Sequence, residues 1–163
     1  MRVHLGSDHA GLDLKQRLAG WLLDHGHQPV DHGAFHRNDE DDYPVFCLRA
    51  AQGVVADQQG GVPALGVVIG GSGNGEQISA NKVAGVRCAL AWSQQTARLA
   101  REHNDANVIS IGARMHSDDE AVGFVETFLD TAFSGDPRHQ RRIDMLSSYE
   151  GSGELPPLPE ADR

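Results

Sequence analysis

The chain has 163 residues, of which 39% are hydrophobic, and its formal net charge is -9 at pH 7. This length and apolar content predict one domain with one buried core. The negative charge argues against a nucleic-acid-binding protein, because contacts with phosphates need clustered Lys and Arg.

Hydrophobic periodicity alternates between strand and helix patterns over residues 1–150. Strands are expected at residues 2–6, 28–33, 64–69, 86–90 and 107–111. Helices are expected to begin at Leu12, at Tyr43, after Gly75, at Ser93, at Ser117 and at Asp136. Local signals support these limits: Gly26 suits a helix end, Pro44 an early helical position, and Ser117 with Glu120 has capping-box form. Residues 151–163 contain three prolines and few large apolar side chains, and we expect a disordered tail there.

Strands that alternate with helices predict a Rossmann-like three-layer α/β/α sandwich around a five-stranded parallel sheet. In such folds, ligands bind beyond the carboxyl ends of the strands. Polar residues at these ends include Asp8, His9, Glu76 and Arg114. We therefore expect these four residues to share one rim of the sheet.

The chain also offers two indications of its location. It begins directly with a strand pattern, and no apolar run approaches the ~20 residues of a spanning helix, so neither export nor a membrane anchor is expected. Cys47 and Cys88 form no C-x-x-C motif and suggest no disulfide framework. We expect a cytoplasmic protein, because free thiols persist in a reducing compartment.

The stretch from Gly66 to Glu76 contains a buried-strand pattern, a glycine-rich turn and the start of a helix. Such a turn gathers unpaired backbone N–H groups around one point and attracts negative charge. Gly70 and Gly75 stand where a phosphate loop has its glycines, but the next residue is Glu76 rather than lysine, and its carboxylate would repel nucleotide phosphates. An acid beside amide donors suits removal of a carbon-bound proton. The alternative is a tight turn with Glu in a first helical turn, where Glu is favoured.

Five spaced motifs carry a resemblance to a known family. They are Gly6–Gly11, Gly70–Gly75 with Ser79–Lys82, Glu102–Asn107, Gly112–Arg114 and Arg138–Arg142. Over about residues 1–150 they resemble the ribose-5-phosphate isomerase B family, which includes related galactose- and allose-phosphate isomerases, and they look most like its actinobacterial branch. The resemblance implies interconversion of ribose 5-phosphate and ribulose 5-phosphate through a cis-enediolate, without a metal or another cofactor. Many members carry a cysteine base where this chain has Gly70, and the branch that lacks this cysteine has a glutamate at the position of Glu76.

The resemblance also implies roles for individual residues. The expected catalytic residues are Glu76 as the base, His103 in opening the sugar ring and Ser72 in holding the enediolate. The expected substrate-binding residues are Asp8, His9, Gly71, Gly73, Asn74, Gly75, Asn104, Arg114, Arg138 and Arg142. The arginines suit the phosphate because a guanidinium binds its oxygens in pairs. Simpler roles remain open: Asp8 as a helix N-cap, Ser72 as a turn residue, and His103 as a cation at a helix C-terminus.

The resemblance also implies how the chain assembles. The family forms dimers whose sites combine the base of one chain with the histidine and arginines of the other. The last helix, which carries Arg138 and Arg142, has no short path back to the Glu76 rim. We therefore expect this C-terminal helix to reach a partner subunit in a homodimer, and whether dimers pair into tetramers stays open. Histidines 25, 27, 32 and 36 match no defined metal-ligand spacing and are expected to be surface residues.

The sequence is also compatible with two other functions. The first keeps the mechanism but changes the substrate to a six-carbon sugar phosphate, because sequence spacing does not measure pocket length. The second is a phosphate- or nucleotide-sensing module, because a fold alone does not fix a function. Glu76 favours an enzyme, since a sensor needs no carboxylate at its anion site.

Overall fold

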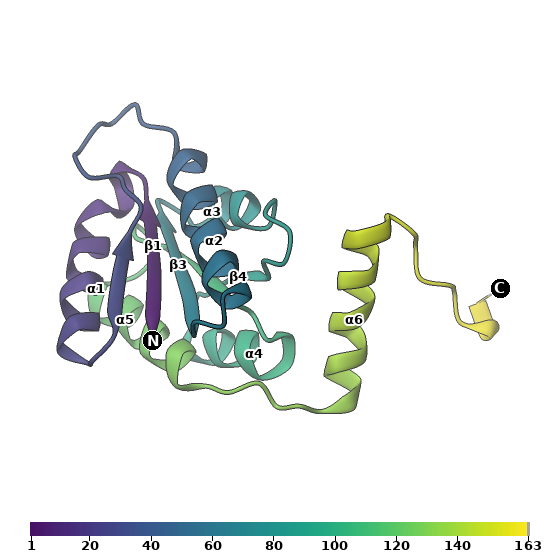
Figure 1. Cartoon of the computed structure of the whole chain (residues 1–163). Coiled ribbons are helices and arrows are strands. Elements are labelled where there is room, and N and C mark those ends of the chain that lie inside the picture. The colour runs from purple at the N-terminus through teal and green to yellow at the C-terminus, as the bar shows by residue number, and fades with distance from the viewer. Residues whose placement is uncertain (163) are drawn as a thin grey trace.

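The computed structural model describes residues 1–162 and has five strands and six α-helices in alternation (Figure 1). The strands are β1 (Arg2–Ser7), β2 (Gln28–Asp31), β3 (Ala64–Gly70), β4 (Cys88–Leu90) and β5 (Val108–Gly112). The helices are α1 (Leu12–Asp24), α2 (Tyr43–Gln59), α3 (Asn74–Ala80), α4 (Gln94–Asn104), α5 (Asp118–Asp130) and α6 (Pro137–Ser152). Two short 3-10 helices span His9–Gly11 and Glu160–Asp162.

The five strands form one parallel sheet in the order β2-β1-β3-β5-β4. Helices cover both faces, and each face has its own apolar cluster: α1, α4 and α5 pack on one side, and α2 and α3 on the other. All seven residues of β3 are buried, because this central strand is covered on both faces. The three-layer α/β/α sandwich expected from the sequence is confirmed.

The register places the functional turns at one edge of the sheet. Ser7 pairs with Ile69, and Gly70 pairs with Gly112, so β1, β3 and β5 end together. Below, "carboxyl edge" means this edge, and "amino edge" means the opposite one, where the strands begin. In Figure 1 the carboxyl edge faces upward, and the N-terminus marks the amino edge.

Several element limits differ from the sequence prediction by one or two residues; β2, for example, ends at Asp31 rather than at residue 33. β4 begins at Cys88 rather than at residue 86, because Val86 donates its N–H to the Val83 carbonyl in a turn and Arg87 donates to the Asn107 side chain. α3 begins at Asn74, two residues earlier than expected, and Gly73 is its N-cap with a φ of 83°. Glu76 is therefore the third residue of that helix.

The last helix, α6, stands apart from the sheet (Figure 1). It contacts α4 near its start, and near its end the Gly85 N–H donates to the Glu150 carboxylate over 2.8 Å. Its apolar residues Met145, Leu146 and Tyr149 are exposed. Residues 153–159 have no regular secondary structure, and disorder of the tail stays a prediction. In residues 1–162, no helix is both long and apolar enough to cross a membrane.

Candidate active site

A cavity of about 520 Å³ lies at the carboxyl edge of the sheet. Its lining comes from several turns: Asp8, His9, Ala10, Tyr43, Gly71, Ser72, Gly75, Glu76, Arg114 and Met115. Backbone hydrogen bonds join these turns, since Ala113 N–H donates to the Gly70 carbonyl over 2.8 Å and Arg114 N–H to the Gly71 carbonyl over 3.1 Å. The structure thus brings together the four rim residues expected from the sequence.

Glu76 is the buried acid of this cavity and is only 4% exposed. Its carboxylate fills the space above Gly70, where a Cβ atom would overlap it. Burial raises the pKa of the Glu76 carboxyl, and the nearby Asp8 carboxylate raises it further. The N–H groups of Glu76 and Gly73 lower the pKa but do not reverse its direction. A helix N-terminus is expected to favour the ionised form, yet here burial outweighs it.

The turn before α3 is shaped by its glycines. Gly73 has a positive φ, and a Cβ there would lie 2.7 Å from the Leu90 side chain. The Ser110 hydroxyl donates to the Gly73 carbonyl over 2.6 Å and fixes the turn from below. Ser72 is exposed at the cavity, and its Oγ accepts from the Asn74 N–H at 3.3 Å. Ser72 therefore makes the local turn contact, which leaves its hydroxyl proton free to be donated to a ligand.

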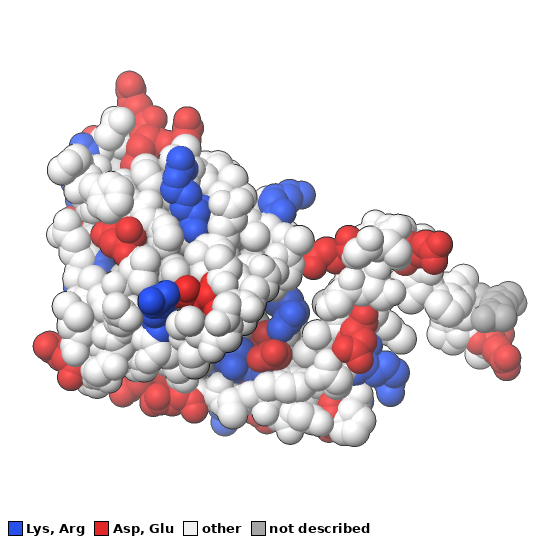
Figure 2. All heavy atoms as spheres, in the orientation of Figure 1, with Lys and Arg blue, Asp and Glu red and all other residues white. Residues whose placement is uncertain are grey.

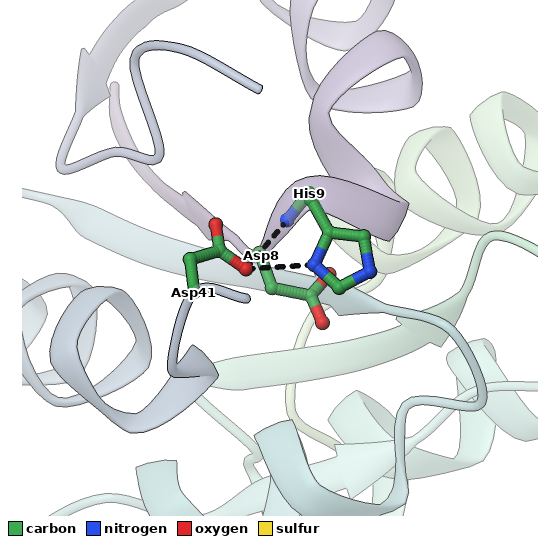
Figure 3. Close-up of side chains that lie close together, drawn as sticks. All are labelled: Asp8, His9 and Asp41. Carbon is green, nitrogen blue, oxygen red and sulfur yellow. Dashed lines mark hydrogen bonds and ion pairs between the residues drawn. The ribbon is translucent and has the colours of Figure 1, made fainter. Parts of the chain in front are cut away.

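Asp8 and His9 lie on the other wall of the cavity. Asp8 caps the short 3-10 helix, because its Oδ1 accepts from the N–H groups of Ala10 at 2.9 Å and Gly11 at 3.2 Å. His9 donates twice to one oxygen of Asp41, from its backbone N over 3.1 Å and from ring Nδ1 over 2.7 Å (Figure 3). The capping role of Asp8 is compatible with a ligand contact, since capping uses Oδ1 only.

Three of these residues could be considered as metal ligands. Asp8, His9 and Asp41 each offer one ligand atom, and these atoms lie within 4.8 Å of one another. Nδ1 of His9 carries the proton that it donates to Asp41, however, and Oδ1 of Asp8 already accepts two N–H groups. These two atoms are therefore already engaged in hydrogen bonds within the protein.

The four histidines considered in the sequence lie outside this cavity. His25 and His36 are exposed, as expected, and His25 stacks on Trp21. His32 is partly buried, and its Nε2 lies 2.8 Å from Nδ1 of His4. The expectation of a purely surface position is therefore wrong for His32, because β1 presents a buried histidine beside it, and for His27, which is partly buried with its Nδ1 atom inside.

The predicted site residues did not include Tyr43 and Met115, which line this cavity, or Asp41, which lies behind His9. Tyr43 packs its ring on Gly75, where a Cβ would lie 2.6 Å from the ring, and Met115 lies at the cavity with its side chain exposed. Asp41 is one of four consecutive acidic residues, 39–42, and no local pattern distinguishes it from the other three. Tyr43 was findable, because the helix after each parallel strand begins at the carboxyl edge.

The remaining predicted residues lie at the other end of the molecule. α4 runs antiparallel to the strands, so His103 and Asn104 at its C-terminus lie at the amino edge, where Asp105 shares a cavity with Met1. The His103 ring lies 4.2 Å from the ring of His139 in α6, measured between centroids. Within one chain, Glu76 and His103 therefore do not meet.

The arginines of α6 belong to this second group. Arg138 and Arg142 are exposed, and Arg138 pairs with Asp136 at 3.2 Å. Figure 2 shows several Lys and Arg side chains in the region between the body and α6, whereas acidic side chains gather over the loop between β2 and α2. Of the predicted cationic residues, the structure places only His9 and Arg114 in the cavity with Glu76.

A larger cavity of about 690 Å³ lies between α6 and the edge of the sheet at β4. Trp92, Leu146 and Tyr149 give it an apolar lining, and Asn104 is the one predicted site residue on its wall. Glu76 and Asp8 do not line it. Size alone therefore does not identify the site, because the convergent polar groups lie in the smaller cavity.

Fold and site together define an α/β protein with a buried carboxyl beside a glycine-rich turn of the kind that binds anions. The family model described as ribose/galactose isomerase matches residues 3–146, and the chain belongs to this family. Over 161 residues, the chain is 58% identical to ribose-5-phosphate isomerase B of Mycolicibacterium paratuberculosis, a match that covers 99% of each chain. The family resemblance expected from the sequence is confirmed.

A solved structure supports the same assignment. The fold is similar to that of ribose-5-phosphate isomerase B from Mycoplasma genitalium with bound ribulose-5-phosphate. The TM-score is 0.86 at 38% sequence identity, and the match covers 93% of this chain and 97% of that chain. The enzyme from Clostridium thermocellum gives a TM-score of 0.85, also at 38% identity, with 94% of this chain and 100% of that chain covered.

Proposed function

We propose that this protein is an aldose–ketose isomerase that interconverts D-ribose 5-phosphate and D-ribulose 5-phosphate. The observation that carries the proposal is the buried Glu76 carboxylate beside the glycine-rich turn. The names of the relatives support this substrate pair, as does the ribulose-5-phosphate bound to the Mycoplasma genitalium enzyme.

The chemistry follows from the cavity. Glu76 takes the proton from C2 of the open-chain aldose, and the electron pair moves through the C1–C2 bond onto the carbonyl oxygen. The N–H groups of residues 71–75 and the Ser72 hydroxyl hold the resulting enediolate oxygens. The Glu76 carboxyl then returns this proton to C1, and the proton of the O2 hydroxyl passes to O1, so that O1 becomes a hydroxyl and O2 the ketone oxygen. A carboxyl that must both accept and return a proton benefits from the raised pKa of Glu76.

The second half of the site would come from another copy of the chain. His103 and Asn104 would act on the sugar, and Arg138 and Arg142 on its phosphate. The separation of these residues from Glu76 supports a two-fold homodimer, because such a dimer can set the amino edge of one subunit beside the carboxyl edge of the other. The exposed apolar face of α6 supports it as well, since it has no other cover in residues 1–162.

Two further assignments accompany the function. Residues 1–150 form the catalytic domain, and the rest of the chain is a tail outside it. The protein works in the cytoplasm, a location that suits two buried cysteines without a disulfide.

Mixing two inactive variants tests the shared site. Glu76→Gln and His103→Ala each damage both sites of their own dimer, whereas a hybrid has one doubly damaged and one intact site. Random pairing makes about half of the dimers hybrids, so roughly a quarter of wild-type activity should return. Hybrids that are seen by mass spectrometry but lack activity would show that the sites lie within single chains.

The substrate is tested separately with the unaltered protein. Ribose 5-phosphate and allose 6-phosphate are assayed side by side at equal concentrations. We expect the five-carbon substrate to have the higher kcat/KM. A higher kcat/KM for allose 6-phosphate would show that the substrate is a six-carbon sugar phosphate. If neither sugar is turned over, the proposed isomerase activity is wrong.

A further inference from the structure

Asp41 is a buried carboxylate that contacts the wall of the cavity through one residue only. Its Oδ1 accepts both the backbone N–H and the ring Nδ1–H of His9 (Figure 3). The Asp41 side chain is 8% exposed, and that of His9 is 20% exposed. Two hydrogen bonds from one residue to one oxygen restrict the rotamer of His9 and fix the direction of its ring.

Stability alone does not explain this carboxylate. Its second oxygen, Oδ2, is buried and has no hydrogen-bond partner among the described residues. A buried carboxylate oxygen without a partner costs free energy, and such groups in native proteins often have a functional reason. The only side chain bonded to Asp41 in residues 1–162 is His9, so that reason is sought in what His9 does.

The loop holds Asp41 independently of any ligand. Asp41 donates its N–H to the Asn38 carbonyl over 3.0 Å, in the turn that leads into α2. At the start of the loop, the buried Nζ of Lys15 donates to the Ala34 carbonyl over 2.6 Å and pairs with Asp31. Asp41 therefore belongs to a fixed frame against which His9 is oriented.

The orientation has a chemical consequence at the other ring nitrogen. A ring that gives its Nδ1 proton to a carboxylate presents Nε2 on its opposite side. In Figure 3, Nε2 points away from Asp41, and His9 lines the same cavity as Arg114. A phosphate bound there would meet Nε2, and in that complex the ring would carry a proton on each nitrogen, between two anionic groups.

We propose that Asp41 is a positioning residue, which holds His9 in the Nδ1–H form so that Nε2 binds the phosphate of the substrate. This inference rests on the proposed function, in which His9 lies beside that phosphate. Asp41 itself does not contact the sugar. It acts through His9, and both its geometry and its charge contribute, because a hydrogen bond between charged groups is stronger than one between neutral groups.

Steady-state kinetics with ribose 5-phosphate give the first test. Asp41→Ala should raise KM, and the inhibition constant of inorganic phosphate, by ~10-fold, with kcat within about twofold of wild type. For Asp41→Asn, both constants should lie between those of wild type and Asp41→Ala, because the amide oxygen still accepts a hydrogen bond from Nδ1 but carries no charge. Asp39→Asn is the matched control: it removes an exposed charge from the same loop and should change nothing.

A spectroscopic readout separates positioning from a merely structural role. Ring nitrogen chemical shifts of His9, assigned by difference from His9→Gln, distinguish the two tautomers of its neutral form. Wild type and Asp41→Asn should show the proton on Nδ1, and Asp41→Ala should show a mixture. A wild-type ring with Nδ1 unprotonated would overturn the proposal and would leave that nitrogen available for a metal ion.

The variant His9→Gln separates the failure of this inference from that of the proposed function. If phosphate inhibits His9→Gln as strongly as wild type, His9 does not bind phosphate, and the placement of the ligand is wrong. If His9→Gln weakens phosphate binding but Asp41→Ala does not, only the role of Asp41 is overturned. If Asp41 acts through His9, adding Asp41→Ala to His9→Gln should weaken binding no further, and additive losses would contradict the inference.

Discussion

The two ends of the sheet differ in how completely one chain builds them. At the carboxyl edge, Glu76 and Asp8 are buried, and backbone hydrogen bonds join the surrounding turns. At the amino edge, Arg138 and Arg142 are exposed on a helix that stands away from the sheet. One chain thus builds the whole surroundings of the proposed base Glu76, whereas Arg138 and Arg142 stay exposed on the same chain.

The electrostatic surroundings differ in the same way. Near Glu76, burial and then Asp8 favour a protonated carboxyl, which suits proton transfer. Near α6, burial lowers the pKa of His139, and the neighbouring His103 and Arg138 lower it further. Positive charge around His139 disfavours a further proton there. The same positive charge attracts an anion such as a phosphate.

The largest effect is expected from Gly70→Ala, which adds a methyl group where the Glu76 carboxylate lies. The carboxylate is the end of a flexible side chain, so it can move aside while the fold survives. Turnover should then fall by at least ~100-fold, the scale for losing a general base. Measuring kcat together with the thermal unfolding midpoint checks both parts.

Gly20→Ala is the matched control for this change, because a Cβ at Gly20 meets no atom within 4 Å. It should leave turnover unchanged. A Gly70→Ala protein with near-normal turnover would mean that the carboxylate position seen here is not the working one, and the base would have to be sought elsewhere.

A smaller effect is expected at the other end. Arg142→Ala should raise KM for ribose 5-phosphate by ~10-fold and leave kcat nearly unchanged, because phosphate binding is felt equally in ground and transition states. Arg141→Ala is the control, since Arg141 is equally exposed but lies about 100° around the helix from Arg142. Equal KM values for the two variants would reduce Arg142 to a solvent-exposed cation.

The two ends also differ in how far the sequence predicted them. The rim was predictable because it rests on local chemistry: Asp8 follows β1, and Glu76 follows a glycine-rich turn after β3. Parallel strands bring such turns to one edge whatever the details of packing. The α/β/α layers followed from the same alternation of strands and helices.

The remaining features depend on contacts that no local pattern encodes. Asp41 reaches His9 across 32 positions, and neighbouring acidic residues of the same loop do not. The raised pKa of Glu76 reverses the expectation from its helix position, because burial is set by the whole fold. The buried pairing of His32 with His4 likewise needs two strands and a helix in place.

The raised pKa of Glu76 predicts how turnover depends on pH. Glu76 accepts a proton only when ionised, so kcat should fall as the pH drops through a value above the ordinary pKa of a glutamate. Asp8→Asn removes one of the causes and should move this acid limb to lower pH without abolishing the upward shift, since burial is the larger cause. Using kcat at saturating substrate avoids titration of the free sugar phosphate. A limb that moves upward in Asp8→Asn would contradict the assignment.

The smallest effect concerns the stability of the fold and the hydrogen-bonded histidines His4 and His32, of which His32 lies in the loop between β2 and α2. His32 bonds His4, whose Nε2 lies 3.0 Å from Asp57, and burial followed by the charge of His4 lowers the pKa of His32 below its usual 6.5. Because the unfolded chain keeps the ordinary pKa, it binds more protons than the folded chain between the two values, and acidification favours unfolding there.

The contribution of His32 to stability should therefore be full above pH 6.5 and decline as the pH falls through the lowered pKa. The stability of His32→Gln should therefore decline less than that of wild type between pH 8 and pH 5.5. His36→Gln, which changes an exposed histidine of the same loop, should follow wild type. Urea unfolding at several pH values gives the comparison, and a His32→Gln protein that loses as much stability on acidification as wild type would show that this pair does not sense pH.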